Sequence, residues 1–98
     1  MKSKVIIFPQ ANKVSFSQID IPKPATGQII TKTIMTGVST GTETRVWLGK
    51  EDPNAFPLIP GYENVGEIIS AGEGVDLEPG TIVFHTGSDV TGDFSRLW

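Results

Sequence analysis

The residues best suited to chemistry lie in the stretch Gly61-Tyr62-Glu63-Asn64-Val65-Gly66. Glu63 is flanked by glycines and is the candidate for a buried functional carboxylate, although it also fits a strand position on the surface. The phenol of Tyr62 is a hydrogen-bond donor that can polarise a carbonyl oxygen without a metal. Its ring fits an equally simple role, in which it packs over the mouth of a barrel.

Several other kinds of site are excluded. The chain has no cysteine, which removes disulfides, thiolate nucleophiles and cysteine-based zinc or iron–sulfur sites. His85 is the single histidine, and without cysteines it makes no metal site, so we interpret it as a polar residue at the end of a strand. The turn Gly72-Glu73-Gly74 lacks the lysine and the following helix of a phosphate-binding loop.

A second polar stretch, Thr40-Gly41-Thr42-Glu43, has the spacing of a capping box, with Thr40 as N-cap and Glu43 as its reciprocal partner. Apolar residues follow at 46–48, and Gly49 stands where a glycine often ends a helix. We therefore predict one short helix over residues 41–48. Glu43 is then explained by capping alone or by a role in a site, and Thr42 fits an ordinary first-turn residue.

The elements that must position these residues are short strands separated by turns. Val14 and Phe16 are out of phase with Ile19 and Ile21, which predicts a bulge or turn near Ser17-Gln18. After residue 84 the alternation is weak, and no further strand is clear. The pattern is typical of a small barrel or sandwich. The predicted strands cover residues 5–8, 14–21, 28–35, 65–70 and 81–84.

Length and charge narrow the class further. The 98 residues suffice for one small domain, the net charge is −3, and the basic residues are scattered singly, which argues against nucleic-acid binding. No apolar run approaches the roughly 18–20 residues of a membrane span, and the N-terminal apolar run is too short for a signal peptide. We expect a cytoplasmic protein without a membrane partner.

Three stretches in order resemble the medium-chain dehydrogenase/reductase family, also called the zinc alcohol dehydrogenase superfamily. They are Gly37-Val38-Ser39-Thr40-Gly41-Thr42-Glu43, Pro60-Gly61-Tyr62-Glu63-Asn64-Val65-Gly66 and Glu78-Pro79-Gly80-Thr81-Ile82-Val83. The resemblance is to the N-terminal catalytic domain of that family. It implies a mainly β fold, a GroES-like, partly open barrel with the one short helix.

The resemblance also assigns roles, residue by residue. Thr42 matches a hydroxyl that relays a proton, Glu63 matches a glutamate behind the metal, and Glu43 matches the acid that orients a zinc-binding histidine. Tyr62 stands in place of that histidine, so Glu43 could accept a hydrogen bond from its phenol. Thr42, Glu43, Tyr62 and Glu63 are therefore the candidate catalytic residues.

The same comparison argues against zinc. Ser39 stands where the family has a cysteine ligand, and serine and tyrosine hydroxyls are protonated near neutral pH, which makes them poor zinc ligands. We expect no metal site. Ser39 and Thr40 are weak candidates for contact with a cofactor.

The family binds NAD(P) on a Rossmann domain through a Gly-x-Gly-x-x-Gly turn, and these 98 residues contain no such motif. We therefore expect a single GroES-like domain over residues 1–98 that is incomplete, truncated before the Rossmann domain and inactive alone. Its whole-enzyme function would be zinc-independent, NAD(P)-dependent oxidation or reduction of a small alcohol or carbonyl substrate.

An alternative from another class is a co-chaperonin-like or other binding module, since GroES has the same fold and a similar length. The segment Ala25–Ile30 resembles a mobile-loop anchor, but Ile29 and Ile30 run directly into a strand pattern. In either case, unpaired edge strands predict self-association.

Overall fold

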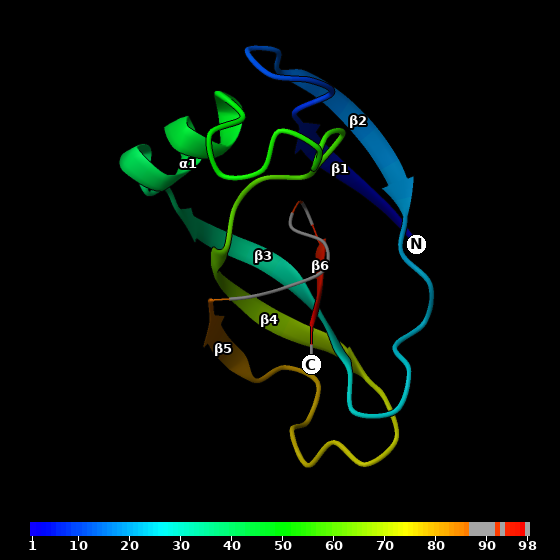
Figure 1. Cartoon of the computed structure of the whole chain (residues 1–98). Coiled ribbons are helices and arrows are strands. Elements are labelled where there is room, and N and C mark those ends of the chain that lie inside the picture. The colour runs from blue at the N-terminus through cyan, green and yellow to red at the C-terminus, as the bar shows by residue number, and fades with distance from the viewer. Residues whose placement is uncertain (87–91, 93, 98) are drawn as a thin grey trace.

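The computed structural model describes residues 1–86, 92 and 94–97, and these form a mainly β protein with one short helix (Figure 1). The prediction of a GroES-like partial barrel is confirmed. The elements in chain order are β1 (Lys2–Ile7), β2 (Ser15–Asp20), β3 (Ile29–Gly37), α1 (Thr40–Trp47), β4 (Glu63–Ala71), β5 (Ile82–His85) and β6 (Phe94–Leu97).

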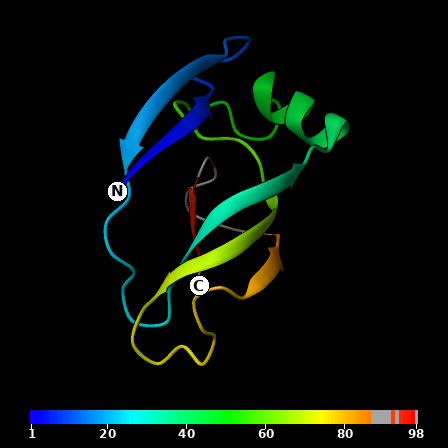
Figure 2. The same ribbon diagram turned by 180° about the vertical axis from the view of Figure 1, so that it is seen from behind.

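The strands make two antiparallel sheets, β1-β2 and β5-β4-β3-β6. Figures 1 and 2 show the smaller sheet beside one end of the larger one, with α1 at that same end. We call the end with α1 and the smaller sheet the open end. The opposite end, where the turns at residues 25–28 and 72–74 bond to each other, is the packed end.

The packed end is built on β3 and β4. Ile29 and Ile68 are buried there, with Ala71, Val75 and Val83 against them. Ile30 is also buried, at 2% exposure. A loop anchor for a partner must be exposed, so the burial of Ile29 and Ile30 argues against a mobile-loop role for this segment.

Polar side chains connect the sheets through β6, a strand that the sequence did not predict. Asn64 donates its amide to the hydroxyls of Ser95 and Thr33, at 2.9 and 3.0 Å. Ser3 of β1 donates to the carbonyl of Phe94 and accepts its N–H, at 3.2 and 3.1 Å. Because Ser3, Asn64 and Ser95 are buried, these bonds tie β1 and β4 to β6 away from water.

The predicted bulge in β2 is wrong. The register of β1 with β2 is continuous, with Ile6 opposite Phe16 and Ser3 opposite Ile19. The strand instead carries apolar side chains on both faces, and Phe16 is left 84% exposed. The register shifts lie elsewhere, between β3 and β4 at Ile30/Thr31 and Thr33/Met35.

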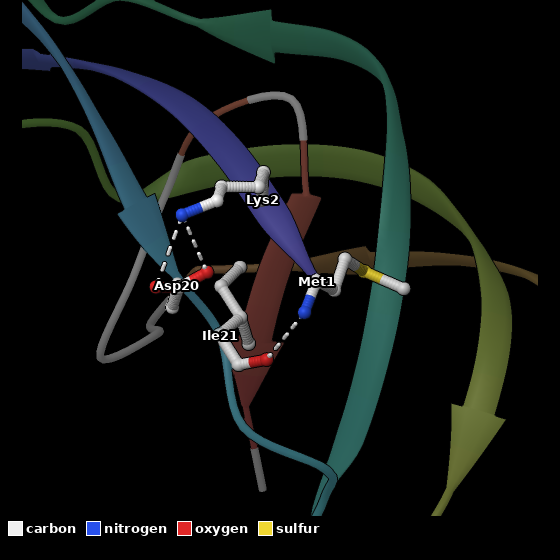
Figure 3. A network of polar contacts seen from close by, with 4 residues as sticks. All are labelled: Met1, Lys2, Asp20 and Ile21. Carbon is white, nitrogen blue, oxygen red and sulfur yellow. Dashed lines mark hydrogen bonds and ion pairs between the residues drawn. The ribbon is translucent and has the colours of Figure 1, made fainter.

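Backbone hydrogen bonds join the start of β1 to the chain just after β2 (Figure 3). Ile21 donates its N–H to the carbonyl of Met1 at 2.7 Å, and the terminal amine of Met1 donates to the carbonyl of Ile21 at 3.4 Å. Lys2 and Asp20 form an exposed ion pair beside them. Such an exposed pair adds little stability, so the two backbone bonds are the main fastening.

Within the described ranges, no helix has the length and apolar character needed to cross a membrane, because α1 has only eight residues.

Candidate functional site

The two polar stretches of the sequence meet because β3 ends where β4 begins. Gly37, the last residue of β3, pairs with Glu63, the first residue of β4. The helix α1 starts three residues after Gly37. The antiparallel pairing therefore brings the start of α1 and the segment Gly61–Glu63 to the same open end of the molecule.

Glu63 lies directly over Gly37. A Cβ atom at position 37 would collide with the Glu63 carboxylate, so only glycine leaves the space that this side chain occupies. Glu63 is half-buried. Gly37 thus leaves the space that the Glu63 carboxylate occupies at this edge of the sheet.

Glu43 connects the helix to the segment that leads into β4. Its carboxylate accepts a hydrogen bond from the backbone N–H of Gly61. Burial raises the pKa of Glu43 above its ordinary value of 4.5, and the bond from Gly61 opposes this rise. The helix and the second polar stretch are therefore joined through a partly desolvated carboxyl group.

The capping-box prediction is wrong for this reason. The N-cap is Ser39 rather than Thr40, and its side chain makes no capping bond. Glu43 reaches across to Gly61 instead of back to the helix start. The helix itself is confirmed, at residues 40–47 rather than 41–48, and Gly49 ends it with a φ of 76°.

The remaining candidates lie on the outer side of this site. The Ser39 hydroxyl donates to the Thr42 hydroxyl at 3.3 Å. Thr40 and Thr42 are exposed, and Tyr62 is half-buried. Ser39, Thr40 and Thr42 are near Glu43 in the chain. The bond that Glu43 accepts comes from the Gly61 backbone and not from the Tyr62 phenol.

A cleft of about 610 Å³ opens between the two sheets, and both carboxylates lie in its wall. The rest of the wall is mainly apolar and includes Phe8, Val14, Phe16 and Val38. A smaller hollow of about 210 Å³ adjoins it at Phe8, Val14 and Glu43 and reaches Trp47. The volume is in the range of small-molecule sites, and the lining suits a ligand with a mostly apolar body and a polar group.

Sequence reasoning missed the part of the cleft that comes from β1 and β2. Val14 and Phe16 are 59% and 84% exposed because they face this space rather than the core. Their phase mismatch with Ile19 and Ile21 was the available signal. A strand with apolar residues on both faces explains this mismatch better than a bulge, because one face of β2 then lines the cleft and the other faces away from it.

The donor set does not suit zinc. Around the open end the chain offers the hydroxyls of Ser39 and Thr42, which bond to each other, and two carboxylates. Within the described part of the chain, no group of three or more histidine, aspartate or glutamate side chains is placed to hold a metal ion. Zinc prefers thiolate, imidazole and carboxylate ligands in sets of three or four.

The Gly72–Gly74 turn does not suit a nicotinamide dinucleotide either. Gly72 packs against the Ala25 carbonyl with no room for a side chain, and its N–H donates to Gln28 at 2.8 Å. The turn thus closes the packed end, and its glycine serves packing rather than phosphate binding. His85 is buried in β5 opposite Asn64.

The family comparison matches residues 25–95 to the alcohol dehydrogenase GroES-like domain. The matched region contains both polar stretches and the strands β3 to β5, and it covers more than half of the chain.

Curated relatives agree with this match. The chain is 33% identical over 92 residues to the 2-desacetyl-2-hydroxyethyl bacteriochlorophyllide A dehydrogenase of Rhodobacter capsulatus, which covers 91% of this chain and 29% of the relative. It is 31% identical to the D-arabinose 1-dehydrogenase (NADP(+)) of Saccharolobus solfataricus, covering 98% of this chain and 29% of the relative. The chain therefore spans less than a third of the length of these relatives.

Solved structures share the fold. The human synaptic vesicle membrane protein VAT-1 homolog-like protein superposes with a TM-score of 0.87 at 21% identity, covering 99% of this chain and 33% of that one. The quinone oxidoreductase of Escherichia coli, solved with NADPH, gives a TM-score of 0.84 at 20% identity and covers 97% of this chain and 31% of that one. At these identities the likeness concerns the fold alone.

Proposed function

The chain belongs to the alcohol dehydrogenase family as a GroES-like domain, and from that membership we propose that it forms the substrate side of a zinc-independent, NAD(P)-dependent oxidoreductase. The observation that carries the proposal is the meeting of Glu43 and Glu63 in the wall of one 610 Å³ cleft. The family's two most informative sequence stretches supply these carboxylates, so the resemblance and the geometry refer to the same place.

In this proposal the substrate is a small alcohol or carbonyl compound. Tyr62 and Thr42 lie beside the cleft rather than in its wall. In the proposal, which takes their roles from the family resemblance, they would donate or accept a hydrogen bond at the reacting oxygen, because a hydroxyl group can do both. Glu43 would hold the Gly61–Tyr62 segment in place through the bond that it accepts from Gly61. Glu63 would place its carboxyl group in the wall of the cleft, in the space that Gly37 leaves for it.

The proposed zinc independence is based on the chemistry of the donors. A metal that polarises the substrate oxygen is replaced in the proposal by the Tyr62 phenol as hydrogen-bond donor. Purified chain produced in zinc-supplemented medium should contain far less than one zinc per chain. Stoichiometric zinc that survives dialysis would contradict this part of the proposal.

A nicotinamide cofactor would supply or accept the hydride. Because the Gly72–Gly74 turn is used for packing, the proposal assigns cofactor binding to a nucleotide-binding domain outside residues 1–98. Residues 1–98 are then one catalytic-side domain that is inactive alone, with Ser39 and Thr40 as its weak candidates for cofactor contact. A second copy of the chain is a further proposed partner, through an open strand edge.

The proposal can be tested with a chimera in which this chain replaces the matching segment of the Saccharolobus D-arabinose 1-dehydrogenase, which aligns with 98% of it. We expect no turnover of NADPH or NADP⁺ by the chain alone, and turnover of a carbonyl or alcohol panel by the chimera. Tyr62→Phe should lower the chimera's kcat/KM by about 100-fold, the usual contribution of one proton-donating group.

Thr26→Val is the matched control, since it removes an exposed hydroxyl from the opposite, packed end and should leave kcat/KM unchanged. A folded chimera that binds NADPH but turns over nothing would overturn the proposal. Equal kcat/KM values for the chimera and its Tyr62→Phe variant would remove Tyr62 from the site.

A further inference from the structure

The two edge strands of the four-stranded sheet, β6 and β5, differ in the hydrogen bonds of their outward-facing backbone groups. At the β6 edge, the buried Ser3 hydroxyl bonds to both backbone groups of Phe94, at 3.1 and 3.2 Å. At the other edge, β5 pairs with β4. Among the bonds between described residues, none reaches the backbone of Ile82 or Phe84 from the open side. The β6 edge is closed by a side chain, whereas the β5 edge can accept another strand.

The register identifies which backbone groups face that open edge. The carbonyl of Thr81 accepts the N–H of Ile68 at 2.8 Å, so Thr81 is turned toward β4. Backbone groups alternate in direction along an antiparallel strand. Val83 and His85 are therefore also turned toward β4, and the N–H and C=O groups of Ile82 and Phe84 point away from the sheet.

The same two residues carry an exposed apolar surface. Ile82 and Phe84 are 55% and 63% exposed, while Val83 packs on the Ile29 and Ile68 core. Phe84 continues a row across the sheet that runs through Val65 to Met35, itself 67% exposed. We call Met35, Val65, Ile82 and Phe84 the outer apolar face; the exposed Glu67, which pairs with Ile82, borders it on β4.

We propose that β5 pairs antiparallel with β5 of a second copy of the chain, about a two-fold axis at Val83. Ile82 then exchanges two backbone hydrogen bonds with Phe84 of the partner subunit, and the symmetry repeats this pair. Outward-pointing residues must meet outward-pointing residues in such pairing. Since these are also the residues of the outer apolar face, the two apolar faces fall on the same side of one continuous sheet.

A second copy fits this edge better than an unrelated segment. An isologous interface needs a surface that complements itself, and Ile82 opposite the partner's Phe84 is an apolar pair in both directions. The strand Ile82-Val83-Phe84-His85 contains no lysine, proline or bulge, the devices that usually block edge pairing. The contact is small, so we expect a dissociation constant of about 10–100 µM.

The mass of the chain measured by light scattering across a concentration series tests the dimer. The wild-type chain should change from monomer to dimer as its concentration rises through about 10–100 µM, the expected dissociation constant. Phe84→Lys should remain a monomer at every concentration, because it places two charges in the apolar contact. Phe16→Lys is the matched control: Phe16 is also an exposed phenylalanine, but it lies in the cleft, so this variant should dimerise like the wild type.

Hydrogen exchange of the wild-type chain tests the register without any substitution. The amides of Val83 and His85 should be protected at all concentrations, because they bond to β4. Those of Ile82 and Phe84 should exchange rapidly when dilute and become protected as the dimer forms. A chain that stays monomeric at several hundred micromolar, about ten times the expected constant, would overturn the proposal. So would a dimer that Phe84→Lys leaves intact, or Ile82 and Phe84 amides that are protected in dilute monomer.

This inference concerns the strand edge and not the cleft. Its failure would leave the proposed oxidoreductase function untouched, and a chimera without turnover would leave the dimer untouched.

Discussion

The packed end and the open end of this small barrel use the same kinds of residue for opposite purposes. At the packed end, isoleucines are buried, and Gly72 lets one turn press against the backbone of another. At the open end, Phe16 and Val38 are 84% and 72% exposed around a cleft, and Gly37 makes room for the Glu63 carboxylate. The buried cluster of Ile29 and Ile68 belongs to the first end, and the cleft to the second.

Burial, and not residue type, separates the two roles. Apolar residues that are buried among others contribute to the free energy of folding, whereas exposed ones around a hollow are available to a ligand. A glycine against backbone is a packing requirement, while a glycine against a carboxylate positions a charged group. Substitutions matched across the two ends can test each half of this statement.

The largest difference is expected between Ile68→Ala and Phe16→Ala. Ile68 is fully buried, so its truncation leaves a cavity and should lower the free energy of unfolding by about 3–4 kcal/mol. Phe16→Ala removes a mostly exposed ring and should change it by less than about 0.5 kcal/mol. Urea unfolding at 25 °C measures both values. Similar losses for the two variants would show that the cleft wall is part of the core.

The two glycines give the next largest effect. A Cβ at Gly72 meets the rigid Ala25 backbone, so Gly72→Ala should cost about 2–3 kcal/mol of unfolding free energy. A Cβ at Gly37 meets the carboxylate of Glu63, which can rotate away, so Gly37→Ala should cost only about 1 kcal/mol. Thermal unfolding followed by circular dichroism measures the loss of stability of the two variants. The reverse order would mean that Glu63 is held more rigidly than the turn at the packed end.

Ser3 lies between the two ends and should give a smaller loss. Ser3→Ala removes the partner of both backbone groups of Phe94 in a buried place, at a cost of about 1–2 kcal/mol. Ser15→Ala is the control, because its hydroxyl makes one exposed bond of 3.4 Å. We expect no measurable change from it in the same urea titration. A stable Ser3→Ala variant would indicate that β6 does not depend on this closure of its edge.

The sequence could predict those helices and strands whose signals lie within a short stretch of the chain. The helix at residues 40–47 has its apolar residues, its terminal Gly49 and its first turn within ten positions. The strand β3 is rich in β-branched residues, with three isoleucines and three threonines among its nine residues. The mainly β barrel followed from such local patterns and from the family resemblance.

The cleft and β6 could not be predicted because they depend on distant residues. Whether Phe16 faces the core or the cleft is decided by what lies opposite β2, and alternation alone is the same in both cases. The strand β6 is fastened by Ser3, which is 91 positions away from Phe94. The sequence leaves Glu43 open between a local cap and a role in a site, because its bond to Gly61 joins two segments that are distant in the chain.

The smallest expected effect is the pH dependence that Glu43 gives to the open end. Because burial raises its pKa, the folded chain holds this proton more tightly than the unfolded chain. The folded state is therefore favoured most below pH 4.5 by this group, and the advantage is lost as the pH rises through the folded pKa. Glu43→Gln removes the charge and keeps an oxygen that can accept the Gly61 N–H.

The melting temperature of Glu43→Gln should accordingly fall less than that of the wild type between pH 4 and 7, and at pH 7 it should be higher by about 1–2 °C. Glu67→Gln removes one negative charge from the exposed face of β4 and controls for the change in net charge. If Glu43→Gln melts lower than the wild type at pH 7, the charged carboxylate stabilises the fold through Gly61. The open end would then be as much a structural device as the packed end.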